Sequence, residues 1–135
     1  MAHVEFQKNA KVSPSLAPTT LGTETKTGSY LSMELAHHAA VIFAFGVIDA
    51  DIAAKLVQAK DVGGTSSKDI VGKTQTVLAA DGGKIFIIEV EGSELDVVNG
   101  FKTIAGVVTG TGATSYVGIA IIRTPLRIGP ASLVT

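Results

Sequence analysis

Apolar residues occur along the chain in short runs that turn residues separate. The most apolar run, Ala40–Ile48, is rich in β-branched and aromatic residues and contains no charged side chain. Such a run is typical of a central strand that is buried on both faces. The segment Asp49–Asp51 that follows it predicts a turn. Residues Ile52–Lys60 fit a strand and a short helix equally, because alanines favour helix while the remaining pattern alternates.

Three further segments have a recognisable pattern. Residues 30–35 alternate between polar and apolar and predict a half-buried strand. Lys84–Glu91 is the clearest strand after the central one, whereas Asp61–Lys73 is polar and predicts a loop. Ser93–Val98 fits a single helical turn that Ser93 would cap.

The last two strands predict an antiparallel sandwich or barrel. Phe101–Thr109 and Ser115–Arg123 are separated by a glycine-rich turn, so we expect them to pair as an antiparallel hairpin. Together with the earlier segments, they make about six or seven strands at regular spacing, with one weak helix. The sequence therefore predicts an all-β fold, an antiparallel β-sandwich of jelly-roll-like or immunoglobulin-like type.

The first part of the chain differs from the rest in composition. Residues 1–28 are rich in Pro, Thr, Ser and Gly, which favours an extended backbone. We expect an extended N-terminal arm over residues 1–28 and a sandwich body over residues 29–135. A disordered tail is the alternative for this segment.

The arm has too few apolar side chains to stabilise itself, because ordering costs about 1–2 kcal/mol per residue. We therefore expect a partner subunit to hold it, through its apolar residues Val4, Phe6, Val12, Leu16 and Leu21. Two further residues are candidates for an interface. Arg123 and Arg127 are the only arginines and flank Pro125. Arginine suits bidentate contacts with carboxylates, although full solvation is an equal alternative for both.

Composition excludes several classes of function. The chain has 135 residues, of which 46% are hydrophobic and 17% charged, with a net charge of -1 and no cysteine. One domain fits this length. The absence of a basic excess argues against nucleic-acid binding, and the absence of cysteine excludes disulfides and thiolate sites. Low charge with high apolar content favours burial of extra surface in an assembly.

No targeting or membrane segment is evident in the sequence. The first 30 residues contain no apolar run like that of a signal peptide. The longest apolar stretch, Ala39–Ile48, has about half the length that a membrane-spanning helix needs. We therefore expect synthesis in the cytoplasm and no membrane partner.

Candidate catalytic residues lack the partners that their chemistry needs. Gly72-Lys73-Thr74 is similar to the end of a phosphate-binding loop, but Ser67 stands where the first glycine is required. Glu89 and Glu91 share one strand face and fit a solvated edge better than a glycosidase pair. We expect no enzymatic activity and no cofactor.

Metal sites are also incomplete. Glu34, His37 and His38 are potential ligands, but neighbouring residues of a strand point to opposite faces, and the remaining histidine is His3. Asp49 and Asp51 have the spacing found in calcium loops without the other ligands of such a loop. We interpret both groups as polar turns, so no metal is expected.

Three stretches carry a resemblance to a known family. They are Val41–Asp51 with Lys55–Asp61 after it, then Gly100–Thr109, and finally Tyr116–Arg123. Together they span most of residues 40–123. In this pattern the body resembles the capsid decoration, or cement, proteins of tailed bacteriophages, which have a β-sandwich body. Residues 1–29 lie outside the matched pattern.

The resemblance implies a non-enzymatic virion protein that binds the outside of a phage capsid and stabilises it, with no catalytic residues and no cofactor. The expected partners are the major capsid protein and further copies of the chain, with a trimer favoured. The expected location is the capsid surface, after synthesis in the host cytoplasm. Alternatives are the main subunit of another viral assembly, such as a tail tube or a small shell, and an adhesion or ligand-binding sandwich module.

Overall fold

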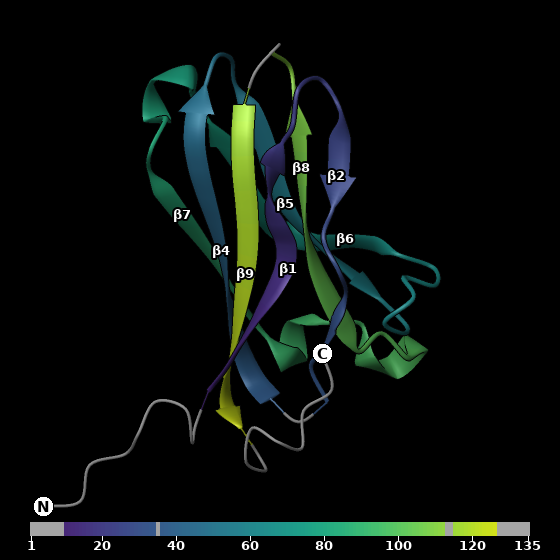
Figure 1. Ribbon diagram of the computed structural model, residues 1–135. Coiled ribbons are helices and arrows are strands. Elements are labelled where there is room, and N and C mark those ends of the chain that lie inside the picture. Colours follow the sequence, from purple (N-terminus) through teal and green to yellow (C-terminus); the bar gives the residue numbers. More distant parts are fainter. Residues whose placement is uncertain (1–9, 35, 113–114, 127–135) are drawn as a thin grey trace, which may run out of the picture.

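Two antiparallel sheets stacked face to face form the molecule in the computed structural model, which describes residues 10–34, 36–112 and 115–126 (Figure 1). Sheet A has the order β1-β9-β4-β7, and sheet B has the order β2-β8-β5-β6 with the short β3 also paired to β8. All pairings are antiparallel. The predicted all-β sandwich is confirmed.

The bounds of the elements are as follows. Sheet A contains β1 (Lys11–Thr20), β4 (Ala36–Ile48), β7 (Ile85–Glu91) and β9 (Ser115–Leu126). Sheet B contains β2 (Thr25–Thr27), β3 (Leu31–Ser32), β5 (Ile52–Ala59), β6 (Lys68–Val77) and β8 (Thr103–Gly110). Three short 3-10 turns complete the description, η1 (Ala79–Asp81), η2 (Gly92–Glu94) and η3 (Val97–Asn99).

The order in which the chain visits the sheets identifies the type of sandwich. Successive strands alternate between sheet A and sheet B, except that β2 and β3 both lie in sheet B and β5 pairs directly with β6. This alternation, with four strands side by side in each sheet, is that of a jelly roll. Of the two types that the sequence left open, the structure has the jelly-roll type.

The predicted hairpin of residues 101–109 and 115–123 is wrong. β8 pairs with β2, β3 and β5 in sheet B, and β9 pairs with β1 and β4 in sheet A. The connection after Gly110 therefore crosses from one sheet to the other. A glycine-rich turn between two strands changes the direction of the chain, but it does not decide whether the second strand bonds to the first.

The strand buried on both faces is β8, not β4 as the sequence suggested. β4 alternates, with Val41 and Phe43 fully buried and Ala44 exposed. Nearly all of β8 is buried, because Ala105 and Val107 on its outer side pack with Val57 and the ring of Tyr30. The segment before β3 therefore covers sheet B, while the outer side of sheet A has no such cover within the described residues.

Of residues 52–60, left open between strand and helix, Ile52–Ala59 form the strand β5. The predicted loop 61–73 is too long, because β6 begins at Lys68. The helical turn expected near Ser93 is two separate 3-10 turns, η2 and η3, and the N-cap of η2 is Glu91 rather than Ser93. These differences arise where tertiary pairing overrides a weak local pattern.

The structure does not support an arm separate from the body over residues 10–28. β1 lies along β9, and β2 lies along β8, so both belong to the sandwich. The polar composition of β1 is explained by its partners, since the inward hydroxyls of Ser13 and Ser15 hydrogen-bond to Arg123 and to the carbonyl oxygen of Ser29. Residues 1–9 lie outside the described residues.

Candidate functional site

The outer face of sheet A is apolar over most of its width. The register places outward residues of the four strands side by side. Three rows cross the sheet: Val12, Ile122, Ala40 and Glu89; then Pro14, Ala120, Ile42 and Ile87; then Gly118, Ala44 and Ile85. We call these residues the outer face of sheet A.

Several of these side chains are well exposed. Val12, Ile85 and Ile87 keep 54%, 63% and 59% of their surface accessible. In an antiparallel sheet with one solvated side, the outward positions are normally polar. Contiguous exposed apolar patches on soluble proteins mark sites of interaction. The only charge in the three rows is that of Glu89, which pairs with His38 at 3.3 Å.

The predicted anchors of the arm divide into three groups. Val12 lies on the outer face of sheet A, where a partner can reach it. Leu21 is 2% exposed and belongs to the core, and Leu16 packs partly against that core. These two leucines contact their own chain, so the structure corrects the prediction for them. Val4 and Phe6 lie outside the described residues.

Arg123 is not a surface residue, which corrects its prediction as an interface contact. Its side chain has no exposed surface and lies between the sheets. Nη1 donates to the carbonyl oxygen of Ser32 at 3.0 Å, and Nη2 donates to Oγ of Ser13 at 3.0 Å. Burial lowers the pKa of the Arg123 guanidinium from its ordinary value, but arginine stays charged at neutral pH. Arg127 lies outside the described residues.

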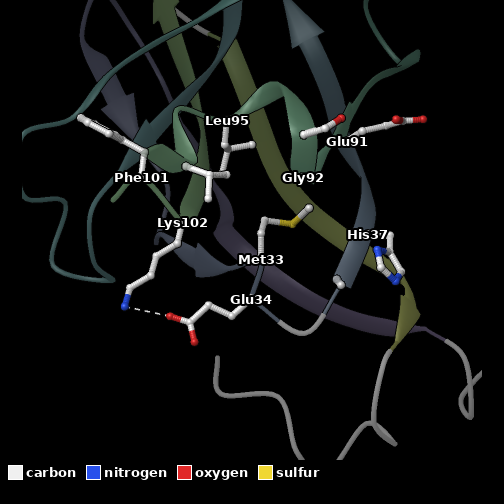
Figure 2. A pocket seen from close by; sticks show the side chains of 11 residues that line it. Met33, Glu34, His37, Glu91, Gly92, Leu95, Phe101 and Lys102 are labelled. Carbon is white, nitrogen blue, oxygen red and sulfur yellow. Dashed lines mark ion pairs between the residues drawn. The ribbon is translucent and has the colours of Figure 1, made fainter. Parts of the chain in front are cut away.

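A hollow of about 480 Å³ opens at one end of the sandwich, beside η2 (Figure 2). Met33, Leu95 and Phe101 form an apolar part of its wall. At its rim, Nζ of Lys102 lies 2.8 Å from Oε1 of Glu34, and this hydrogen bond raises the pKa of Lys102. The hollow fits a small apolar group, and the charges of Glu34 and Lys102 at its rim already satisfy each other.

The segment that resembles a phosphate-binding loop is part of a strand. Gly72 and Lys73 lie within β6, where Gly72 has a φ of 77°. Nζ of Lys73 pairs with Oε2 of Glu94 at 3.1 Å. A phosphate-binding loop needs backbone amides that converge ahead of a helix, and no helix follows this segment directly in the chain, because β6 continues to Val77.

The candidate metal ligands Asp49, Asp51 and His38 form contacts within the chain that hold loops and neighbouring strands together. Oδ1 of Asp49 accepts a hydrogen bond from the hydroxyl of Ser115, and Oδ1 of Asp51 accepts one from the amide of Ala79. Within the described ranges, no group of three or more His, Asp or Glu side chains is placed to hold a metal ion. Over the same ranges, no helix has the length and apolar character to span a membrane.

Sequence reasoning missed the apolar outer face. Its signal was present in the run Ile85-Phe86-Ile87-Ile88, where the odd-numbered and the even-numbered residues are both apolar, so both faces of the strand carry apolar side chains. Phe86 and Ile88 pack against the core, so Ile85 and Ile87 must point outward. The strand was identified, but which strand lies beside it depends on the tertiary structure.

Comparisons with known proteins give similarity of fold. No model of a protein family and no curated protein matches the chain. Among solved structures, a subunit of the pili formed by Bacillus endospore appendages matches with a TM-score of 0.52 and 14% identity, over 93% of this chain and 97% of that chain. The SPBc2 prophage-derived protein YomS matches with a TM-score of 0.51 and 8% identity, over 90% and 99%.

A chain of the Triatoma virus structure matches with a TM-score of 0.54 and 8% identity, over 98% of this chain and 73% of that chain. At these identities the comparisons show a shared β-sandwich fold.

Proposed function

We propose that this chain is a non-enzymatic structural protein of a virion that binds the outside of a tailed-phage capsid and stabilises it. The observation that carries the proposal is the apolar outer face of sheet A. A protein that contacts a large neighbour with one sheet face needs such a surface. The sequence resemblance to phage decoration proteins, and the fold shared with YomS and a Triatoma virus chain, support the same class.

The face has the properties of a permanent contact surface. Its three rows contain aliphatic side chains, two prolines of β1 lie at its edge, and its one carboxylate is at the end of a row. Apolar burial contributes about 25 cal/mol per Å², so covering this face against a capsid provides the affinity. In this proposal the major capsid protein supplies the covering surface.

The test uses purified capsids of a tailed phage that lack their decoration protein. The wild-type chain should bind, and the copies bound per capsid should saturate. Ala44→Lys places a charge on the exposed face, between Gly118 and Ile85, and should weaken binding at least about tenfold. Val71→Lys is the matched control, because Val71 is 93% exposed on the other sheet. Equal binding by the two variants would show that the outer face of sheet A does not contact the capsid.

A second candidate is a subunit that assembles with itself into a tube or small shell. The same apolar face favours it, and so does the fold shared with the endospore pilus subunit. Electron microscopy of the purified protein separates the candidates. Tubes or shells formed by the chain alone support the second candidate, and particles of a fixed small size support the first.

A further inference from the structure

We propose that two copies of this chain join through β7, whose free edges pair antiparallel about Ile87 to make one continuous eight-stranded sheet. The contact does not require a capsid, so it is independent of the proposed function. Its starting point is that β7 pairs with β4 on one side and, among the described residues, with no strand on the other.

The other sheet edges of the described fold carry features that oppose strand addition. β1 contains Pro14 and Pro18, which lack the amide hydrogen that a neighbouring strand needs. β6 has Gly72 at a φ of 77° and a shift of register opposite Lys55–Val57. β2 has three residues. Natural proteins protect edges by these means.

β7 has none of these protections. Its seven residues contain no proline, and its register with β4 runs without a shift from Ala44 to His38. Ile85 and Ile87 are exposed on it, as described above. Because long, regular apolar edges pair readily with another strand, β7 is the edge that invites a partner.

The direction of the backbone groups follows from one hydrogen bond. The amide of Phe45 donates to the carbonyl oxygen of Lys84 at 3.1 Å, so the Lys84 position bonds toward β4. Bonding direction alternates along an antiparallel strand. The even-numbered residues Phe86, Ile88 and Val90 therefore bond to β4, and the odd-numbered residues 85, 87, 89 and 91 direct their amides and carbonyls away from the sheet.

One end of this free edge is already closed. The outward amide of Glu91 donates to Oε1 of Glu94 at 2.9 Å. This bond also lowers the pKa of Glu94 and so keeps its carboxylate ionised. Among the residues that the structure describes, open backbone groups therefore remain at Ile85, Ile87 and Glu89, with Ile87 at their centre.

A second copy of the same strand matches this set. Antiparallel pairing about Ile87 places Ile87 opposite Ile87 of the second copy, and Ile85 opposite Glu89 of the second copy. All three positions become hydrogen-bonded pairs, which exchange two bonds each. The pairing thus gives hydrogen-bond partners to the outward backbone groups of residues 85, 87 and 89 in both copies. It does not involve Glu91, whose amide already donates to Glu94.

The side chains are complementary in the same register. Phe86 faces Ile88 of the second copy, so two partly buried apolar side chains meet. Lys84, whose side chain is 63% exposed, faces Val90 of the second copy between two glutamates. Nζ of Lys84 already pairs with Oδ1 of Asp81 at 3.1 Å in its own chain, so this charge adds little to the contact. The match of apolar with apolar positions, and of each open backbone position with another, favours a second copy over an unrelated strand.

The resulting dimer has a two-fold axis perpendicular to the sheet. Opposite residues of an antiparallel pair point to the same side, so the outer faces of sheet A in the two copies lie on one side of the molecule. Pairing through β7 would double the apolar face. A trimer, which the resemblance to decoration proteins implies, would need β7 to contact a different surface of the next copy, so the number of subunits distinguishes the two arrangements.

The experiment measures the mass of the full chain by light scattering over a range of concentrations. Wild type should be a dimer. Ile87→Lys places two like charges opposite each other at an exposed position and should raise the dissociation constant at least about tenfold. Val71→Lys, on the edge strand of the other sheet, should remain a dimer. A monomeric or trimeric wild type, or a dimer unchanged by Ile87→Lys, would overturn the proposal.

Cross-linking gives a second readout that does not depend on a disruptive variant. The chain has no cysteine, so Ile87→Cys and Val71→Cys each introduce a single thiol. A short bis-maleimide should link the Cys variant at position 87 into covalent dimers and leave the variant at position 71 largely monomeric. Equal yields from the two variants would contradict pairing about Ile87. A wild-type chain that forms the dimer but does not bind capsids would instead contradict the proposed function and leave the pairing through β7 intact.

Discussion

Arg123 of β9 donates a hydrogen bond from Nη1 to the backbone carbonyl oxygen of Ser32 in β3, at 3.0 Å across the space between the two sheets. Nη2 of the same guanidinium donates to Ser13 in β1. One buried side chain therefore connects sheet A, sheet B and the strand that opens the described fold. Such a contact costs desolvation of the charge, and the hydrogen bonds that Ser32 and Ser13 accept from the two terminal nitrogens offset this cost.

Replacing this guanidinium should destabilise the fold. Arg123→Met keeps much of the volume and leaves Ser32 and Ser13 without their donor, so the free energy of unfolding should fall by about 2–3 kcal/mol. Urea denaturation followed by circular dichroism measures the change. Lys55→Met is the control, because Lys55 forms an exposed ion pair with Asp69 and should change stability by less than about 1 kcal/mol. Equal losses would contradict a special role for Arg123.

Leu21 should behave as a core residue. Leu21→Ala removes a side chain that is 2% exposed, and the cavity should lower the free energy of unfolding by about 2–5 kcal/mol. Val12→Ala, at a position 54% exposed on β1, should change stability by less than about 0.5 kcal/mol. Denaturant midpoints of the two variants provide the comparison. A Leu21→Ala protein as stable as wild type would contradict the assignment of Leu21 to the core.

Two deletions should have different effects on folding. Removing residues 2–27 takes away β1 and β2 and exposes the edges of β9 and β8 that these strands cover, so the truncated chain should lose its cooperative thermal transition. Removing residues 2–9 leaves every described strand complete, and the transition should remain.

The shorter deletion also tests the predicted anchors Val4 and Phe6. If they hold a partner subunit, the chain without residues 2–9 should fold and bind capsids more weakly than the full chain. Unchanged occupancy on the capsid would remove residues 2–9 from the interface.

Stability should decrease in acid because several carboxylates are hydrogen-bonded in the folded chain. Hydrogen bonds from Lys68, and then from Asn99, lower the pKa of Asp96 below its ordinary value of 3.8. Hydrogen bonds from Thr65 do the same for Asp61. A carboxyl with a lowered folded pKa contributes its stability in full above the unfolded value and loses it as the pH falls through the folded value.

Urea midpoints measured between pH 6 and pH 2 should therefore fall most steeply below pH of about 4. Asp96→Asn should be less stable than wild type at pH 6 and should lose less on acidification. Asp69→Asn, which changes an exposed carboxylate on β6, serves as the control. Parallel pH profiles for Asp96→Asn and wild type would contradict the role of Asp96.

The sequence by itself determined that the chain is all-β. β-Branched runs at strand spacing located β4, β7, β8 and β9 to within a few residues, because a strand must place apolar side chains on at least one buried face. The sequence by itself also argued against disulfides, thiolate sites and nucleic-acid binding, because the absence of cysteine and of a basic excess is a property of composition and does not depend on the fold.

Only the tertiary structure decided how the strands are joined and which surfaces remain open. Alternation along a strand is the same whether its neighbour is β1 or β5, so the sequence could not assign β8 and β9 to different sheets. A serine contributes the same polar composition to a linker as to a strand that packs beside a buried arginine. Ser13 therefore counted toward an extended arm, whereas in the fold its hydroxyl accepts a hydrogen bond from Arg123. Likewise the strand that contains Ile85 and Ile87 was predicted without its exposed face, because an apolar side chain does not encode whether anything covers it. That depends on the position of β7 at the edge of sheet A, which long-range pairing determines.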